Sequence, residues 1–312
     1  MTQKIHVAVG VIRNEMDQFL VSKRHEHLHQ GGLWEFPGGK VETYETTLAA
    51  LQRELREELN IDVRQAEPLV KISHQYTDKQ VLLDVWIVTE YDGLVNSQLQ
   101  QPIKWLSLSE LSNYSFPAAN QEILKCLSLP PYYAITGEFE NKDDYFQKFS
   151  KCLDSGVKLI QLRYKGEDEN LLSELAEYSK KSCDEVGARL LVNSDIDFLS
   201  LCDVDGIHLN SQLLHQYSSR PISNEKILAA SVHTRNDLLQ AMKIKTDFIV
   251  VSPVFKTTSH PDASTLGYDG LSDLICCSNI PVYALGGMKQ DMLIDVKNSG
   301  AYGIAAISEF WK

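Results

Sequence analysis

The chain contains no run of 18 consecutive apolar residues. A helix that crosses a membrane needs about 20 predominantly apolar residues, so we expect neither a membrane span nor a membrane partner. The first residues, 1–4, precede a predicted strand and not the apolar stretch of a signal peptide. These absences lead us to expect a cytoplasmic protein.

Cysteine is scarce, and basic charge is in deficit. The six cysteines show neither a C-x-x-C spacing nor the pattern of a secreted disulfide scaffold, which predicts buried or free thiols in a reducing compartment. The 30 Lys and Arg residues stand against 42 Asp and Glu residues, for a net charge of −12. Because polymeric DNA or RNA is bound through a basic surface, we expect no polymeric nucleic acid as a partner.

Length and composition favour two globular domains of the α/β class. The 312 residues exceed the size of one ordinary domain, and the hydrophobic content of 43% with 23% charged residues is typical of globular proteins. A break signal, Ser-Leu-Pro-Pro, occupies residues 128–131. We therefore predict one domain over residues 1–128 and a second over residues 132–312.

The most informative segment is residues 39–61, GKVETYETTLAALQRELREELNI. Thr46 or Thr47 can cap the start of a helix. Apolar residues then recur at helical spacing, at Leu48, Leu51, Leu55 and Leu59. The pattern predicts an amphipathic helix that ends near Asn60, a residue that tolerates the left-handed conformation of a helix end.

Three glutamates cluster on the adjacent face of this predicted helix. Glu54, Glu57 and Glu58 stand at positions i, i+3 and i+4, so their charges repel one another. A divalent cation would turn that repulsion into binding, and Mg²⁺ also bridges to substrate phosphates. A solvated helix rich in Glu and Arg is the alternative interpretation of these three residues alone.

The wider pattern resembles the Nudix box, a signature of enzymes that cleave a nucleoside diphosphate linked to another moiety. Gly39, Glu45, the triplet Arg53-Glu54-Leu55, the pair Glu57-Glu58 and Ile61 follow one another in that order, after the run WEFPGGK at residues 34–40. The resemblance extends over residues 4–127 and is similar in particular to the MutT-type 8-oxo-dGTP diphosphatases. It implies an N-terminal Nudix α/β/α sandwich with a mixed sheet.

The resemblance also implies roles for individual residues. Glu54 would activate water, oriented by Arg53 and accompanied by Glu57, in hydrolysis of 8-oxo-dGTP to 8-oxo-dGMP and pyrophosphate that keeps oxidised guanine out of DNA. The cofactor would be Mg²⁺, with Mn²⁺ as an alternative. The implied metal ligands are Gly38 or Gly39, Glu54, Glu57 and Glu58. The implied contacts of a nucleoside triphosphate are Arg24, His29, Glu35, Phe36, Pro37, Gly38 and Asn120.

Two departures leave the base preference open. Relatives often carry an acid in the loop where residues 98–101 read QLQQ, and Asp84 replaces an aromatic in the predicted strand 81–88. Asn120 lies in the segment FPAAN, residues 116–120, which resembles the base-reading segment of the family. An ordinary turn and helix cap is the alternative for that segment.

Beyond residue 131, short apolar runs alternate with amphipathic stretches. Eight strands with intervening helices predict a C-terminal (β/α)₈ TIM barrel, with its ligand sites at the carboxyl ends of the strands. The expected strands are 132–135, 159–163, 189–193, 206–209, 227–231, 248–252, 282–285 and 303–307. The expected helices include 143–153, 171–186, 235–242 and 290–298.

Residues at these strand ends resemble the thiamine phosphate synthase/TenI family over residues 133–309. The matching segments are QLRYK (161–165), LVN (191–193), DGIHL (205–209), ASVH (230–233), VFKTT (254–258) and ALGGM (284–288). The chain departs where the synthase holds Mg²⁺, because Asn193 is followed by Ser194 and residues 210–213 contain no acid. We therefore predict a barrel that is not a competent thiamine phosphate synthase.

Three interpretations of the barrel stay open: it binds a phosphorylated small molecule, it isomerises a thiazole phosphate, or it is a structural appendage. A helix expected to start near Ser308 would contribute backbone N–H groups to a phosphate site. The candidate ligand contacts are Gln161, Arg163, Lys165, Asn193, Thr257, Gly286, Gly287 and Ser308, with surface ion pairs as the alternative for the charged ones. For the whole chain, the alternatives are hydrolysis of thiamine diphosphate or its precursors and a barrel that senses a phosphate ligand.

Overall fold

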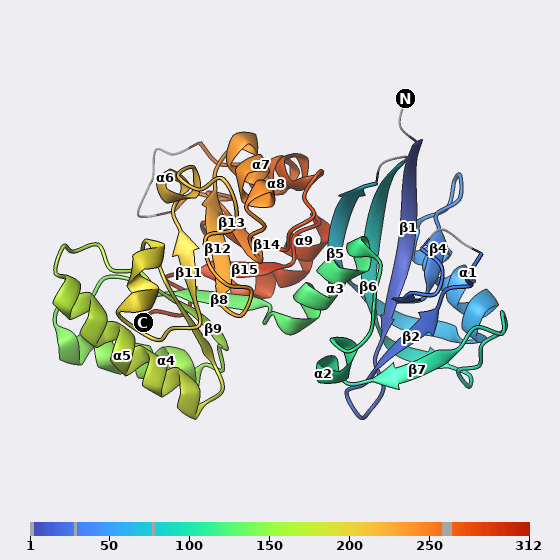
Figure 1. The fold of residues 1–312 in the computed structure, drawn as a ribbon, viewed down its shortest axis with the longest axis horizontal. Helices are drawn as coiled ribbons and strands as arrows, with labels where there is room; N and C mark the ends of the chain where they lie inside the picture. The colour runs from blue at the N-terminus through green and yellow to red at the C-terminus, as the bar shows by residue number, and fades with distance from the viewer. Residues whose placement is uncertain (1–2, 28–29, 77–78, 258–263) are drawn as a thin grey trace. The chain divides into compact units, whose positions relative to one another are not determined.

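The computed structural model describes residues 3–27, 30–76, 79–257 and 264–312, which divide into two compact units (Figure 1). The first unit comprises Met1–Ser128 and Cys276–Asn279, and the second comprises Leu129–Ile275 and Ile280–Lys312. Within the described ranges, no helix has both the length and the apolar character needed to cross a membrane.

The first unit is built on a mixed four-stranded sheet in the order β4-β1-β6-β5, beside an antiparallel three-stranded sheet in the order β3-β2-β7. β1 runs parallel to β6, and both outer pairs, β1 with β4 and β5 with β6, are antiparallel. The strands are β1 (Gln3–Ile12), β2 (Phe19–Lys23), β3 (Trp34–Glu35), β4 (Gly38–Lys40), β5 (Asp62–Gln75), β6 (Lys79–Asp92) and β7 (Ile103–Leu106). The predicted mixed-sheet fold is confirmed.

The predicted glutamate-rich helix is α1 (Thr47–Leu59), and it packs against β1, β4 and β5. The hydroxyl of Thr46 accepts a hydrogen bond from the N–H of Ala49 at 3.2 Å and caps the helix. Leu51, Leu55 and Leu59 are buried in the core of the unit. Since burying a leucine contributes about 1.5–3 kcal/mol, this apolar stripe holds the helix on the sheet.

The end of α1 is set by Asn60, as predicted. Its backbone is left-handed, with φ 58° and ψ 40°, and its N–H donates to the carbonyl of Arg56 at 3.0 Å. The chain can then reverse direction and enter β5 two residues later. The remaining helices of the unit are α2 (Leu108–Leu111) and α3 (Ala118–Ser128).

The second unit is a closed barrel of eight parallel strands, β8 to β15, in chain order (Figure 1). Its strands are β8 (Tyr132–Ile135), β9 (Leu159–Leu162), β10 (Arg189–Val192), β11 (Gly206–Leu209), β12 (Ile227–Val232), β13 (Phe248–Val251), β14 (Val282–Leu285) and β15 (Gly303–Ala306). The intervening helices are α4 (Lys142–Asp154), α5 (Glu169–Glu185), η1 (Ile196–Ser200), α6 (Ser211–Leu214), α7 (Arg235–Lys243), α8 (Gly267–Ile275), η2 (Gln290–Met292) and α9 (Leu293–Asn298). The predicted barrel is confirmed.

Aromatic rings fill the barrel at the amino-terminal end of its strands. Tyr133, Phe248 and Tyr283 stand at the first or second position of β8, β13 and β14, and their ring centroids lie 5.0–5.7 Å apart. Rings at such distances gain from edge-to-face packing beyond the area they bury. This end of the barrel is closed, so a ligand would enter from the carboxyl end.

A chain of polar side chains crosses the barrel interior above these rings. Gln161 donates through Nε2 to the hydroxyl of Tyr133 at 3.1 Å. Nδ1 of His208 lies 3.3 Å from the same hydroxyl, and its Nε2 lies 2.9 Å from the hydroxyl of Ser231. Burial lowers the pKa of His208 to about 3, and the nearby charge of Arg163 acts in the same direction. His208 is therefore neutral in the folded protein.

Replacing Asn60 by Ala should destabilise the first unit by about 1 kcal/mol, because alanine lacks the short polar side chain that lets Asn adopt the left-handed conformation. Urea unfolding monitored by tryptophan fluorescence measures this, since Trp34, Trp86 and Trp105 all lie in that unit. Asn60→Gly is the matched control, because glycine adopts φ 58° without strain. Equal loss of stability in both variants would contradict the assigned helix end.

The burial of neutral His208 predicts a pH dependence of barrel stability. Between its unfolded pKa of about 6.5 and its folded value, the unfolded chain binds a proton that the folded chain does not, so stability falls as pH falls, by up to about 1.4 kcal/mol per pH unit. Urea unfolding followed by circular dichroism from pH 7 to pH 5 should show this loss. His208→Asn should lose the slope, whereas the surface variant His233→Asn should keep it; an unchanged slope in His208→Asn would refute the assignment.

Candidate functional site

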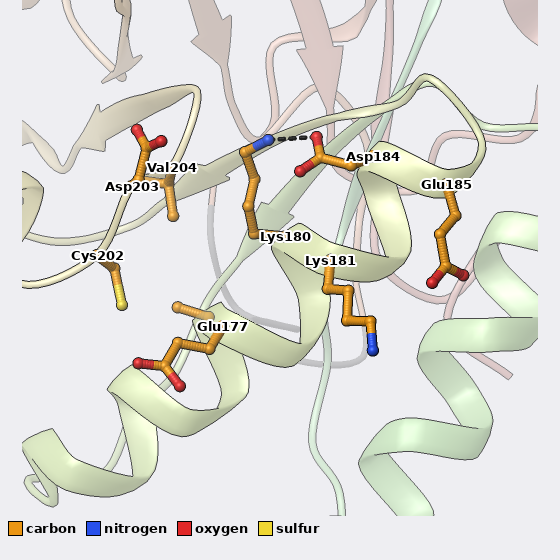
Figure 2. A pocket seen from close by; sticks show the side chains of 9 residues that line it. Glu177, Lys180, Lys181, Asp184, Glu185, Cys202, Asp203 and Val204 are labelled. Atoms are coloured by element: carbon orange, nitrogen blue, oxygen red, sulfur yellow. Dashed lines mark hydrogen bonds and ion pairs between the residues drawn. The ribbon is translucent and has the colours of Figure 1, made fainter.

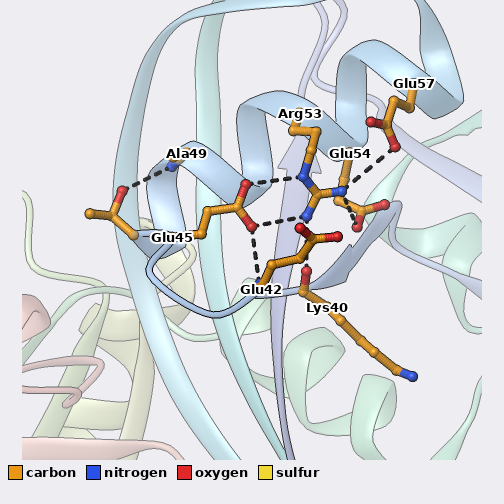
Figure 3. A network of polar contacts seen from close by, with 8 residues as sticks. Lys40, Glu42, Glu45, Ala49, Arg53, Glu54 and Glu57 are labelled. Carbon is orange, nitrogen blue, oxygen red and sulfur yellow. Dashed lines mark hydrogen bonds and ion pairs between the residues drawn. The ribbon is translucent and has the colours of Figure 1, made fainter.

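Arg53 lies at the centre of a network of carboxylates beside α1 (Figure 3). Its Nε and one terminal nitrogen donate to the two oxygens of Glu45, at 3.0 Å each. The other terminal nitrogen donates to Glu54 at 2.8 Å and lies 3.6 Å from Glu57. The carbonyl of Lys40 accepts a further bond at 3.0 Å. Because paired bonds of this kind fix a guanidinium in orientation, Arg53 holds Glu54 in place.

The same contacts keep both members of the central pair charged. Hydrogen bonds to Glu45, and then to Glu54, raise the pKa of Arg53 above its already high ordinary value. The hydrogen bond from Arg53 lowers the pKa of Glu45 below its ordinary range. Arg53 and Glu45 therefore both stay charged around neutral pH.

Two glycines in β4 bring the backbone against these carboxylates. Gly38 has a φ of +144°, and a Cβ there would lie 2.1 Å from the carbonyl oxygen of Ala8. A Cβ on Gly39 would lie 2.1 Å from Cδ of Glu54. A side chain at either position would displace the strand or the glutamate, so the sequence needs glycine at both.

Glu58 lies one turn beyond Glu54 and accepts a hydrogen bond from the N–H of Gly38 at 3.2 Å. Burial raises the pKa of Glu58 to about 7; the hydrogen bond from Gly38 opposes this, and the negative charges of Glu35 and Glu54 add to it. Negative charges gathered in a partly buried place repel one another. A cation bound among them would relieve that repulsion.

A second group of polar residues lies between β3 and α3. The N–H of Phe36 donates to Oδ1 of Asn120 at 3.1 Å, and the Asn120 side chain is buried. The ring of Phe36 stacks on Phe116 with centroids 6.0 Å apart. Arg24 forms an ion pair with Glu35. Burial raises the pKa of Glu35, and the charge of Arg24 opposes that shift.

One cavity of about 550 Å³ joins the two groups. Its volume falls in the range of small-molecule sites, roughly 300–1,000 Å³. The predicted site residues that line it are Arg24, Glu35, Phe36, Gly38, Gly39, Glu54, Glu58 and Asn120. Pro37 is buried outside the lining, and Glu57 lies outside it with 61% of its side chain exposed. His29 lies outside the described residues.

The donor set at one end of this cavity fits a hard divalent cation. Glu54 and Glu58 supply carboxylate oxygens, and the Gly39 backbone comes close to Glu54 because no Cβ intervenes. In the described part of the chain, no three His, Cys, Asp or Glu side chains are gathered as one metal-binding group. A cation here would therefore take further oxygens from backbone, water and substrate phosphate, as Mg²⁺ commonly does.

Asp84 turns away from the cavity. Val81 and Leu83 line it, and alternate residues of a strand point to opposite faces. The side chain of Asp84 is 6% exposed, and its Oδ2 accepts from the hydroxyl of Thr47 at 3.3 Å and lies 3.4 Å from His6. Asp84 therefore anchors the start of α1 and does not touch a base in the cavity.

The loop before β7 reaches the cavity without an acid. Leu99 and Gln101 line it, and the N–H of Gln98 donates to the carbonyl of Glu58 at 2.8 Å. The carboxylates in the cavity lining consequently come from α1, as Glu54 and Glu58, and from Glu35 and Glu42.

The residues predicted for a barrel ligand have different individual surroundings. Gln161 is 2% exposed and lies within the interior network. Asn193 donates to the carbonyl of His208 at 2.9 Å, and exposed Lys165 pairs with Glu138 at 3.1 Å. The remaining candidates that follow the carboxyl ends of β9, β13 and β14 are Arg163, Thr257, Gly286 and Gly287.

The prediction that a helix starts near Ser308 is wrong. β15 ends at Ala306, and residues 307–310 form a turn in which the carbonyl of Ile307 accepts from the N–H groups of Phe310 and Trp311. Phe310 and Trp311 are buried against the barrel. Their packing holds residues 307–310 in the turn, so the chain does not continue as a helix. The expected phosphate site at a helix N-terminus is not formed there.

A hollow of about 570 Å³ lies on the outside of the barrel between α5 and the residues before β11 (Figure 2). Lys180 pairs with Asp184 one turn further along α5, and Cys202 and Asp203 form the other side of the hollow. None of the predicted site residues lines it. It lies beside the amino-terminal end of β11, the end that serves stability in such barrels.

Comparison with known proteins assigns both units. The family model of thiamine monophosphate synthase matches residues 132–310, and that of the NUDIX domain matches residues 8–126. A putative thiamine-phosphate synthase 2 of Aquifex aeolicus is 35% identical over 184 residues, covering 59% of this chain and 99% of the relative. The 8-oxo-dGTP diphosphatase of Escherichia coli is 34% identical over 122 residues, covering 39% and 95%.

Among solved structures, a thiamine phosphate pyrophosphorylase from Pyrococcus furiosus is 26% identical, covers 57% of this chain and 85% of its own, and has a TM-score of 0.47. The match to the NUDIX domain, together with the carboxylates that line the cavity, supports a hydrolase in the first unit. The chain belongs to the Nudix hydrolases through its first unit and to the thiamine monophosphate synthase/TenI family through its barrel.

Glu45, near the cavity, and Tyr76, in its lining, are among the residues that were not predicted as site residues. Glu45 holds Arg53 through two hydrogen bonds, and its place in the box pattern was the available signal. Tyr76 lines the cavity from the end of β5. Nothing in the local sequence pattern indicates its role, because its position depends on how the β5–β6 hairpin meets α3.

Replacing Arg53 by Lys should lower kcat for nucleotide hydrolysis by about 10²-fold, since an ammonium cannot bind Glu45 and Glu54 at once and a misplaced catalytic group costs on that order. Steady-state kinetics measures this. Arg56→Lys is the matched control, because Arg56 is exposed on the same helix and pairs with Asp62. If both variants kept wild-type kcat, the orienting role of Arg53 would be lost.

Proposed function

We propose that this protein hydrolyses 8-oxo-dGTP to 8-oxo-dGMP and pyrophosphate with Mg²⁺ as cofactor, and so removes an oxidised precursor from the nucleotide pool. The observation that carries the proposal is the single cavity, with Glu54 and Glu58 at one part of its wall and Asn120 at another. A nucleoside triphosphate needs both, an anionic metal-binding region for phosphates and an amide for the base. The similarity to the E. coli diphosphatase supports the same substrate.

In the proposed reaction, one water molecule is consumed. Its oxygen bonds to phosphorus, the bridging P–O bond between the α- and β-phosphates breaks, and the products are the monophosphate and pyrophosphate. Glu54 accepts a proton from the water. The hydrogen bond from Arg53 orients the carboxylate of Glu54 toward the cavity. A cation bound at Glu54, Glu58 and the glycine backbone would neutralise charge on the phosphoryl oxygens.

Glu57 is proposed to act as a metal ligand, as the resemblance to the Nudix box implies. Its side chain lies 3.6 Å from Arg53 and outside the lining. It is proposed as a ligand that turns inward only when a cation is present, since rotation about its side-chain bonds is sufficient to bring a carboxylate of this length to a new partner.

The barrel is proposed as an accessory domain without thiamine phosphate synthase activity. No acid follows Asn193 directly, and residues 210–213 carry none. Arg163 follows β9, and Gly286 and Gly287 follow β14, all after the carboxyl ends of barrel strands, so a phosphorylated small molecule is its proposed ligand. Calorimetry with thiazole phosphate and pyrimidine phosphate tests this, and absence of binding by both would refute it.

The function is tested with the purified full chain on 8-oxo-dGTP, dGTP, dATP and thiamine diphosphate, each with Mg²⁺. We expect the highest kcat/KM for 8-oxo-dGTP, and a loss of about 10²–10⁴-fold in kcat for Glu54→Gln, because that is the usual contribution of a general base. Glu90→Gln, on an exposed residue of β6, is the control and should match the wild type.

Two results would overturn the proposal. Equal kcat/KM for 8-oxo-dGTP and dGTP would remove the specificity for an oxidised base. Preferred cleavage of thiamine diphosphate would support the second candidate function, which the covalent link to a barrel of the thiamine monophosphate synthase family favours.

A further inference from the structure

Asp84 is a buried carboxylate whose side chain is 6% exposed, and its Oδ2 atom is approached from three other elements. The hydroxyl of Thr47, the first residue of α1, donates to it at 3.3 Å. Nε2 of His6 on β1 lies 3.4 Å away, and Nζ of Lys71 on β5 lies 3.8 Å away. Because an isolated charge is costly to bury, these contacts compensate for the burial of the carboxylate.

The strand register makes this arrangement part of the sheet. Lys71 is the direct partner of Asp84 in the antiparallel pair of β5 and β6, and opposite charges at such positions stabilise one another. In the parallel pair of β1 and β6, Ala8 is the partner of Asp84, and His6 stands two residues earlier on the same face. Contacts from the strands on either side of β6 therefore hold Asp84 in place.

The amino end of α1 lacks an acidic residue of its own. The first turn of the helix contains none, although the unpaired N–H groups of a first turn carry partial positive charge that a carboxylate stabilises. Asp84 brings a negative charge to this end from the sheet, at Thr47. The contact thus combines a hydrogen bond with a favourable interaction between a carboxylate and the helix dipole.

Thr47 stands close in sequence to the residues that orient the catalytic glutamate. Glu45, two residues before it, accepts two hydrogen bonds from Arg53, which also donates to Glu54. Both sides of this network are tied to the first turn of α1, because Glu45 precedes that turn and Arg53 follows it in the same helix. A shift of the amino end of α1 would therefore displace Glu54 relative to Gly39, the residue of β4 against which it lies.

From these contacts we infer that Asp84 is a positioning residue for the proposed hydrolysis. It holds the amino end of α1 through the hydroxyl of Thr47, and so sets where Glu54 and Glu58 stand in the cavity lining, although Asp84 lies outside that lining. The inference rests on the proposed function only for the reaction that is measured. Asp84 acts on the site through the helix and contacts neither metal nor substrate.

The test uses the full chain with four single variants and one double variant. Thr47→Val keeps the shape of the side chain and removes the hydroxyl, whereas Thr47→Ser keeps the hydroxyl. Asp84→Ala removes the carboxylate, and the double variant combines Thr47→Val with Asp84→Ala. Thr89→Val is the matched control, because Thr89 is an exposed residue of β6 outside the cavity lining, and its hydroxyl donates to a backbone carbonyl at 3.3 Å.

Two readouts separate a positioning role from a purely structural one. The first is kcat and KM for 8-oxo-dGTP with Mg²⁺, at a temperature where circular dichroism shows every variant to be folded. The second is the affinity for Mn²⁺ without nucleotide, followed by electron paramagnetic resonance, which does not depend on turnover. A residue that only stabilised the fold would change the melting temperature and leave both readouts at their wild-type values.

We expect Thr47→Val to lower kcat about tenfold with little change in KM, and to weaken Mn²⁺ binding, because a displacement of about 1 Å can cost up to about 10²-fold in rate. Thr47→Ser should recover the wild-type values, and Thr89→Val should match them. Asp84→Ala should show the same loss as Thr47→Val. The double variant should lose no more than either single variant, since substitutions that remove one shared contact are not additive.

Wild-type kcat and Mn²⁺ affinity in Thr47→Val would overturn the inference. Losses that multiply in the double variant would also overturn it, because Asp84 would then act without Thr47. A wild-type protein that prefers another nucleotide to 8-oxo-dGTP refutes the proposed function alone, and the same variants then decide the role of Asp84 on that nucleotide. A wild-type protein that neither binds Mn²⁺ nor cleaves a nucleotide refutes both.

Discussion

The guanidinium of Arg53 is the contact on which the first unit's site depends. It joins Glu45, from the loop after β4, to Glu54 on α1, and it also binds the carbonyl of Lys40 at the end of β4. Without a cation between them, the two carboxylates would repel each other and the loop would lose its attachment to the helix. The five N–H groups of one arginine thus fix the strand, the loop and the helix together, which a lysine cannot do.

Along β6, side chains alternate between the face of the sheet that lines the cavity and the face that packs against α1. On β6, the side chains of Val81 and Leu83 face the cavity. The side chain of Asp84 lies on the opposite face of the sheet and contacts the start of α1. The same sheet therefore offers an apolar wall to a ligand and a buried anchor to the catalytic helix. This arrangement accommodates an acidic residue at position 84 without placing it in the cavity lining.

Much of the fold could be predicted from local patterns. The eight barrel strands fall within one residue of their predicted positions, because each is a short apolar run between turn signals. The ends of α1 could also be predicted. Thr46 caps the start through its own hydroxyl, and Asn60 ends the helix through its left-handed backbone. These features depend on residues close together in sequence, where propensity and spacing are informative.

The rest depends on contacts between distant residues. Helical spacing predicted Glu54, Glu57 and Glu58 on one face of α1. Which of these side chains line the cavity depends on where β4 packs, and only Glu54 and Glu58 of the three do so. The position of Gln161 near the end of a strand predicted a ligand contact. In the barrel its side chain points to the interior and donates to the hydroxyl of Tyr133. Spacing along the chain cannot supply either fact.

Direct binding of Mn²⁺ to the full chain, followed by electron paramagnetic resonance without nucleotide, tests the central claim that the carboxylates beside Gly39 form a metal centre. Binding by the wild type that weakens at least about tenfold in Glu58→Gln is the predicted result, because the variant removes one of the two carboxylates that α1 contributes to the lining. Mn²⁺ affinity that is the same in wild type and Glu58→Gln would contradict it.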